Sequence, residues 1–300
     1  MAGVELRQMR YYVAVAEELH FGRAATRLHI STPTLSQQIK QVEREIGTPL
    51  LIRHSRGVEI TAAGEVFLDH ATKTIAAAEL ALTETRRAAG LDEPELRLGL
   101  LNGVPGSLPK ALESLASERF PGCKVTPIAG TTTEQLRRLS TGDVDLALIR
   151  IPVTLPPATD SAKLAEEELG VLLTATHPLA DSTEITLDQL RDHELIWIQR
   201  EAAPEFYDDA IERLGGPGLR ISSTAMSHSQ LRSALLVRPD AITLGSRRAA
   251  DSEIVWRPIQ GHPLIATYTA IWRTDSRNPV LRAMTVSPGL TTMRKHVVDL

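Results

Sequence analysis

Apolar residues near the N-terminus recur at the spacing of amphipathic helices. Between Leu6 and Ala16 they return every three or four positions, which predicts a helix with one buried face. Phe21 and Gly22 are expected to end this helix. A second, short helix is indicated over residues 24–28. The chain therefore opens with two short helices joined by a tight turn.

A third helix is indicated after Ser31-Thr32-Pro33, where a hydroxyl can cap free amides and proline is tolerated in the first turn. Gly47 is expected to end it, because glycine readily adopts the left-handed conformation that closes helices. The apolar positions of this segment fall on one stripe. They are Leu35, Ile39, Val42 and Ile46.

Two strand-like runs, 50–53 and 58–61, flank the polar turn 54–57 and predict a hairpin. Thr61 then caps a helix from about Ala62 to Ala89, which would be about 40 Å long. Such a helix is too long to bury its apolar stripe against the small domain before it. We expect a second copy of the chain to cover this stripe, which comprises Phe67, Ala71, Ile75, Ala78 and Leu82.

After a hinge at 90–95, the pattern changes to strands alternating with helices, which favours parallel βαβ units. The proline-rich stretch 152–157 divides this region into two lobes. Strands are expected at 96–101, 124–128, 144–149, 170–174, 194–198, 220–223, 241–244, 256–258 and 266–272, and helices at 108–117, 133–139, 204–214, 229–236 and from about 279.

Charge and composition narrow the function classes. The chain of 300 residues has a net charge of −4, which excludes a uniformly basic nucleic-acid coat. Residues 20–60 nevertheless carry six Lys/Arg against three Asp/Glu, a small local basic excess. The single cysteine, Cys123, excludes an internal disulfide and a cysteine-paired zinc site. Neither a signal peptide nor an apolar run of membrane-spanning length is found, so we expect a soluble, cytoplasmic protein without membrane contact.

The face of the third helix opposite its apolar stripe is polar and suits the DNA major groove. Glutamine can read adenine in two-point fashion, and lysine and arginine meet phosphates or guanine. The alternative is an ordinary solvated helix face. The capped helix, the basic hairpin and the preceding short helix favour a helix-turn-helix with a β wing. The polar face comprises Thr34, Gln37, Lys40, Gln41 and Arg44.

Residues 6 to about 89 resemble the N-terminal domain of LysR-type transcriptional regulators. The shared landmarks include Arg23-Ala24-Ala25, Pro33, Leu35-Ser36 and Thr61-Ala63-Gly64. At Thr32 this sequence departs from the family, which often has a glutamine there that helps to read the operator. The resemblance implies DNA contacts from Arg23, Ser31, Thr32, Pro33, Thr34, Ser36, Gln37, Lys40, Arg53 and Arg56, and dimerisation through Phe67, Ile75, Ala78 and Leu82.

The resemblance continues more loosely through Leu108-Pro109, Phe120-Pro121, 142–147 and 177–180. It implies an α/β protein with an N-terminal winged helix-turn-helix, a long linker helix and a C-terminal two-lobed effector domain like a periplasmic binding protein. Crossover strands are expected near 151–159 and 264–269. The implied domains are 1–61, 62–90 and 91–300, with lobe I at about 94–152 plus 269–300 and lobe II at about 157–265.

The effector cleft can be placed approximately. Ligands of open α/β sheets bind beyond the strand ends, and anions favour helix N-termini. Thr133 is expected to cap its helix. Arg150 could grip a ligand carboxylate or pair with a neighbouring acid, and in the second case the cleft would be mainly apolar. The candidate contacts are Asn102, Gly103, Val104, Thr131, Thr132, Arg150, Ile198, Gln199 and Ser227.

Enzymatic motifs are missing from the sequence. We find no Ser/His/Asp order, metal-ligand spacing or glycine-rich phosphate loop, and His177 lies in a structural turn. The expectation is a non-enzymatic regulator without cofactor or metal. It binds double-stranded operator DNA, responds to a small-molecule inducer such as an organic acid, contacts RNA polymerase if it is an activator, and forms a homodimer or homotetramer. The rivals are a solute-binding or enzymatic α/β protein with a helical appendage, and a LysR-type regulator without an inducer.

Overall fold

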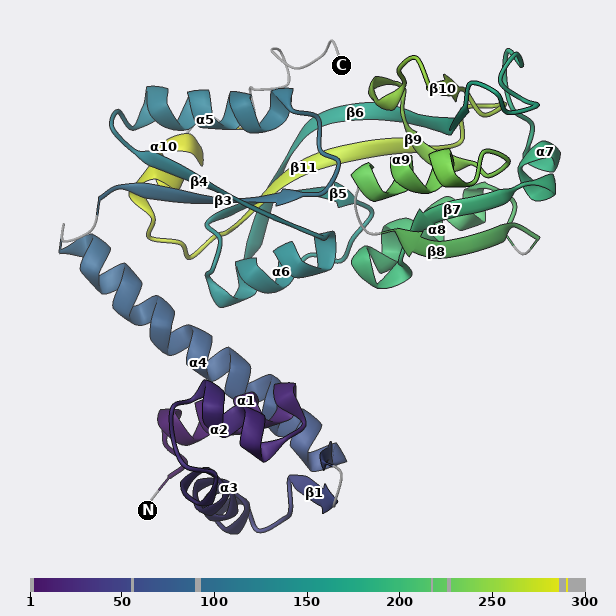
Figure 1. Ribbon diagram of the computed structural model, residues 1–300. Helices are drawn as coiled ribbons and strands as arrows, with labels where there is room; N and C mark the ends of the chain where they lie inside the picture. The colour runs from purple at the N-terminus through teal and green to yellow at the C-terminus, as the bar shows by residue number, and fades with distance from the viewer. Residues whose placement is uncertain are drawn as a thin grey trace. The chain divides into compact units, whose positions relative to one another are not determined.

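A computed structural model describes residues 3–54, 57–89, 93–216, 218–225, 228–285 and 290. The chain forms two compact units, Met1–Ala89 and Gly90–Leu300 (Figure 1). Each unit has its own hydrophobic core. The expected α/β architecture with an N-terminal helix-turn-helix is confirmed.

The N-terminal unit consists of helices around a small core, followed by a hairpin. The first break lies at Leu19 and His20, not at Phe21 and Gly22 as expected. Leu19 is left-handed with φ 48°, and the His20 ring accepts the amides of Gly22 and Arg23, so Phe21 begins the next helix. The elements are α1 (Leu6–Glu18), α2 (Phe21–Arg27), α3 (Thr32–Ile46), β1 (Leu51–His54), β2 (Gly57–Ile60) and α4 (Ala62–Ala88).

Helix α3 starts and packs as its spacing indicates. The Ser31 hydroxyl accepts the Thr34 amide at 3.2 Å and caps the helix. Leu35, Ile39 and Val42 are fully buried, and each such burial contributes about 1.5–3 kcal/mol. Ile46 was expected to complete the stripe but is 39% exposed, because the helix ends beside it at Gly47.

Helix α4 is partly covered by its own chain, which corrects one expectation. The Phe67 ring meets Tyr12 edge-on at 4.9 Å, and Ala71 is buried. Arg10 of α1 reaches Glu79 at 3.0 Å, so α1 lies along α4 as far as this residue. Leu82, farther along, is 68% exposed. The expectation that nothing in the chain covers the stripe was therefore wrong for Phe67 and Ala71.

The C-terminal unit begins with a parallel sheet. Strand β3 lies between β4 and β5 and is parallel to both, as the βαβ pattern predicts. Helices α5 and α10 cover one face of these strands and α6 covers the other (Figure 1). We call this part lobe I. Its elements are β3 (Glu95–Leu101), α5 (Ser107–Arg119), β4 (Lys124–Gly130), α6 (Thr132–Thr141), β5 (Leu146–Ile151) and α10 (Pro279–Thr285).

The rest of the unit, which we call lobe II, packs around a second group of strands. Strands β7 and β8 pair in parallel, and β9 and β10 each pair with β6. The elements are α7 (Leu187–Asp192), β7 (Glu194–Ile198), η1 (Arg200–Ala202), α8 (Pro204–Arg213), β8 (Arg220–Ala225), α9 (His228–Val237), β9 (Thr243–Ser246), η2 (Arg247–Ala249) and β10 (Ile254–Arg257).

Two long antiparallel strands join the lobes: β6 (Thr159–Thr174) and β11 (Ile265–Arg273). The sequence indicated only residues 170–174 of β6 as a strand and placed the first crossover at 151–159. In the structure the crossover strand begins at Thr159 and pairs with β11 as far as Glu168. The charged residues of β6, including Lys163 and Glu166, interrupt its apolar pattern because one side of this ribbon is solvent-exposed.

Candidate functional site

One face of α3 is exposed and polar. Thr32, Pro33, Thr34, Gln37 and Lys40 are all exposed, while the opposite stripe is buried. The Thr34 hydroxyl lies 2.7 Å from that of Ser31. The side chains of Gln37 and Lys40 make no hydrogen bond or ion pair within the described part of the chain, although the Lys40 carbonyl accepts from Arg44. This arrangement leaves the Gln37 amide and the Lys40 amine available to a partner.

Arg53 of the hairpin is held against α3. Its guanidinium donates to the Ser36 hydroxyl at 2.7 Å and lies 4.5 Å from the centre of the Phe21 ring. Glu43 lies 3.8 Å from it and also accepts the amides of Leu50 and Leu51. Arg53 therefore links the hairpin, α2 and α3, with 34% of its side chain exposed. Arg56 lies outside the described residues.

Arg23 is more exposed than Arg53 and is tied to the preceding helix. Its guanidinium pairs with the Glu18 carboxylate at 3.3 Å and also donates to the Glu18 carbonyl. With 63% of the side chain exposed, it can exchange these contacts for a phosphate. Arg23 and Arg53 thus both lie in the N-terminal unit, and Arg53 stacks on the first residue of the helix that carries Arg23.

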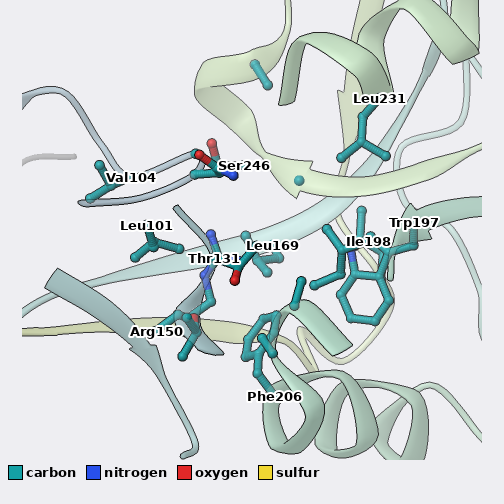
Figure 2. A pocket seen from close by; sticks show the side chains of 18 of the residues that line it. Leu101, Val104, Thr131, Arg150, Leu169, Trp197, Ile198, Phe206, Leu231 and Ser246 are labelled. Atoms are coloured by element: carbon teal, nitrogen blue, oxygen red, sulfur yellow. The ribbon is translucent and has the colours of Figure 1, made fainter. Parts of the chain in front are cut away.

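The C-terminal unit contains a cavity of about 310 Å³ (Figure 2). Residues of lobe I, including Leu101, Thr131 and Arg150, and residues of lobe II, including Ile198 and Leu231, line it. Seven of the predicted effector contacts line this cavity. Gln199 is not among the described lining residues, and Ser227 lies outside the residues that the structure describes. The seven are Asn102, Gly103, Val104, Thr131, Thr132, Arg150 and Ile198.

The N-terminus of α6 supplies the polar end of the cavity. Thr131 is the cap: its hydroxyl accepts the Glu134 amide at 3.2 Å, and Glu134 accepts the Thr131 amide at 2.7 Å. The expectation that Thr133 is the cap was wrong. The Thr133 hydroxyl instead donates to the Glu201 carbonyl of lobe II at 2.8 Å. Thr132 is buried against the cavity.

Arg150 projects from the end of β5 without an acidic partner in the described part of the chain. Its Nη2 donates to the Tyr268 hydroxyl at 3.3 Å. The guanidinium lies 4.9 Å from the centre of the Phe206 ring and 5.3 Å from that of Tyr268. Its Nε is buried without a hydrogen-bond partner. Such a guanidinium can still donate hydrogen bonds to a ligand carboxylate.

Most residues of the apolar cavity wall were not predicted from the sequence. Trp197 stacks on Tyr207 at 5.0 Å and lies 6.0 Å from Phe206, which makes a rigid aromatic surface. The wall as a whole combines segments that are far apart along the chain, from Leu169 to Tyr268, so local residue spacing could not predict it. The further lining residues are Leu169, Trp197, Ala202, Ala203, Phe206, Leu231, Leu244, Gly245, Ser246, Arg248, Ala249 and Tyr268.

His177 occupies a structural turn, as the sequence indicated. It is buried, its Nδ1 accepts the Leu179 amide at 3.1 Å, and its Nε2 lies 3.2 Å from the Asp240 carbonyl. This pattern fits a neutral imidazole that donates through Nε2. His177 is absent from the described lining of the cavity.

Within the described residues no helix combines the length and apolar character needed to cross a membrane. The same residues contain no group of three or more His, Cys, Asp or Glu side chains arranged to hold a metal ion.

Comparison with known proteins assigns both units. Residues 6–65 match the bacterial regulatory helix-turn-helix model of the lysR family, and residues 89–285 match the LysR substrate binding domain. The regulator BudR of Raoultella terrigena is 31% identical, with 93% of this chain and 98% of that protein covered. HcaR of Escherichia coli, the Hca operon transcriptional activator, is 32% identical, with 93% and 95% covered.

The fold matches a solved structure along nearly its whole length. The crystal structure of CbnR, a LysR family transcriptional regulator, is 24% identical and covers 97% of this chain and 98% of that one, with a TM-score of 0.67. These relatives are transcriptional regulators, and the family model that matches the C-terminal unit is a substrate binding domain. This chain therefore belongs to the LysR family of DNA-binding, effector-responsive transcriptional regulators.

Proposed function

We propose that this regulator binds a pseudo-palindromic operator in the cytoplasm with the exposed face of α3 in the major groove. Gln37 would contact a base edge, because its amide is exposed and has no bonded partner in the described chain. Arg53 and Arg23 would contact backbone phosphates. As an activator the protein would also contact RNA polymerase. The other proposed DNA contacts are Ser31, Thr32, Pro33, Thr34, Ser36, Lys40 and Arg56.

The effector of the C-terminal cavity is a small organic acid. The observation that carries this proposal is Arg150, a cavity-lining guanidinium that has no carboxylate partner among the described residues. The α6 N-terminus adds the positive end of a helix dipole beside Thr132. The apolar wall would hold the rest of the molecule, and a cavity of about 310 Å³ suits a small ligand.

Thermal-shift measurements on the full chain test this function. Organic acids should stabilise the wild type, and each acid should be compared with its neutral amide as the matched control. Arg150→Ala should remove most of the stabilisation, because a charge-assisted contact contributes about 1.5–3 kcal/mol. Thr132→Val should reduce it. Stabilisation by the amides alone, unchanged in Arg150→Ala, would instead favour an apolar cavity and refute the acid.

A further inference from the structure

The two guanidinium groups among the described lining residues of the cavity differ in their pairing. Arg248 of η2 holds the Glu167 carboxylate in two-point fashion, with Nε–Oε1 at 2.7 Å and Nη2–Oε2 at 2.8 Å. Arg150 instead donates to the neutral Tyr268 hydroxyl. Arg248 is therefore already neutralised by a carboxylate, whereas Arg150 has no acidic partner among the described residues.

Glu167 is the centre of this arrangement. Its side chain is only 8% exposed, and its Oε2 also accepts the Tyr268 hydroxyl at 2.9 Å, the same hydroxyl that accepts from Arg150. Burial works to raise the pKa of Glu167, but the ion pair with Arg248 and hydrogen bonds from Tyr268 and Ser246 outweigh it and lower the pKa. The carboxylate is thus ionised at neutral pH.

We propose that Glu167 masks Arg248 and thereby makes the cavity selective for a monoanionic effector over a dianionic one. This inference rests on the proposed function, since it specifies the acid that the same cavity accepts. Glu167 acts through Arg248 and does not line the described cavity, so it is a specificity-determining residue behind the cavity wall.

Electrostatics explains the selectivity. A second ligand carboxylate would lose its hydration free energy on entering the cavity. Arg248 could compensate for this loss only if its ion pair with Glu167 were broken. The displaced Glu167 carboxylate would then repel the ligand from close range, which is a penalty directed against the wrong partner. A monocarboxylate avoids both penalties, because Arg150 binds its single charge while Trp197 and Phe206 contact its apolar part.

The test measures binding to the full-length protein by calorimetry with two matched pairs of acids: benzoate with terephthalate, and hexanoate with adipate. Wild type should bind each monocarboxylate at least about tenfold more tightly than its dicarboxylate partner. Glu167→Gln keeps the shape and one oxygen that can accept from Tyr268, and it removes the negative charge that neutralises Arg248. It should tighten dicarboxylate binding by about tenfold and change monocarboxylate binding much less.

Two further variants separate masking from a general charge effect. Glu168→Gln removes the same charge from the next position of β6, where the side chain pairs with His262 at 2.6 Å, and should behave as wild type. Glu167→Gln combined with Arg248→Gln removes both members of the pair and should restore the preference for monocarboxylates. Thermal melting of each variant checks that it folds.

The outcomes distinguish this inference from the function on which it rests. Equal wild-type affinity within each acid pair, or a Glu167→Gln variant with the same preference as Glu168→Gln, would overturn the masking role and leave the acid effector intact. If none of the four acids bound to the wild type while their neutral amides did, the acid effector itself would be wrong, and the masking role with it.

Discussion

Gln37 and Gln38 are adjacent on α3 and have opposite surroundings. Gln37 is exposed, whereas the Gln38 amide oxygen accepts from Gln8 of α1 at 3.2 Å. Gln37→Ala should weaken binding to the specific operator by about 1–3 kcal/mol and relax the preference at one base pair, because a base-reading contact is lost.

Fluorescence anisotropy with the operator and its single-base variants at fixed salt measures both effects. Gln38→Ala is the matched control, since it removes the same amide from the internal side of the helix, and its base preference should equal that of the wild type. A Gln37→Ala protein with wild-type affinity and preference would show that this face does not read bases.

His177 provides a test of pH dependence. Burial lowers the pKa of His177 below its ordinary value of 6.5, and the nearby His193 adds to this effect while the Asp240 carbonyl opposes it. The unfolded chain therefore takes up the proton first. Stability from this residue is fully present above about pH 6.5 and is lost as the pH falls below that value towards the folded pKa.

Replacement of His177 by asparagine should flatten this dependence. The Asn oxygen can still accept the Leu179 amide, but it does not titrate. Urea unfolding of wild type and His177→Asn at several pH values below about 6.5 measures the slope of the unfolding free energy. Parallel slopes in the two proteins would contradict the assignment of a neutral, buried imidazole to the folded state.

At the scale of elements, α4 divides into a covered and an uncovered part. Phe67 packs on Tyr12, Ile75 and Ala78 are half-buried, and Leu82 is 68% exposed. We expect a homodimer through the part that includes Ile75, Ala78 and Leu82. Ile75→Asp combined with Leu82→Lys should give monomers in analytical ultracentrifugation and weaken operator binding strongly, because a single half-site is a poor target.

A second substitution on α4 distinguishes dimerisation from folding. Phe67→Ala removes a contact within one chain, so it should lower the melting temperature of the N-terminal unit while the folded protein stays oligomeric. An unchanged oligomer in the Ile75→Asp/Leu82→Lys protein would exclude this part of α4 from the dimer interface.

The elements also show how far local patterns reach. Helix α3 and its cap were predicted because the spacing of Leu35, Ile39 and Val42 and the hydroxyl of Ser31 act within a few residues of each other. Strand β6 was mostly missed, because its first part is stabilised by hydrogen bonds to β11, about a hundred residues farther along the chain. Its charged, half-solvated pattern carries no local strand signal.

For the whole molecule, the hydrogen bond from Thr133 to the Glu201 carbonyl connects lobe I with lobe II beside the cavity. Thr133→Val keeps the size of the side chain but removes the donor and leaves the Glu201 carbonyl without it. The observed arrangement of the two lobes around the cavity should then be less favoured. The affinity for an acid effector should therefore fall by about three- to tenfold.

Calorimetry with benzoate and hexanoate measures this change. Thr141→Val is a suitable control, since the hydrogen bonds of its hydroxyl within the described chain go to α6 and Asp143, at the far end of the same helix. Operator binding without effector should be the same in both variants and in wild type. Undiminished acid affinity in Thr133→Val would mean that this bond between the lobes does not contribute to effector binding.

The sequence by itself determined the local structure and the class of protein. Helix faces, the Ser31 cap, the alternation of strands and helices, and the cavity-lining loops at 101–104 and 131–132 all follow from residues close together in the chain. The residues of the α3 face and their roles in DNA contact stay predictions. The same holds for the domain limits and the effector contacts.

Tertiary structure alone decided which distant side chains meet. Phe67 was expected to face a partner and instead packs on Tyr12. Arg150 bonds to Tyr268, a neighbour 118 positions away, and its contact with an effector stays a prediction. The pairing of Glu167 with Arg248 likewise depends on where β6 passes lobe II. The physical reason is the same in each case: spacing dictates which face of an element is apolar, but the contact between two elements depends on the packing of the whole chain.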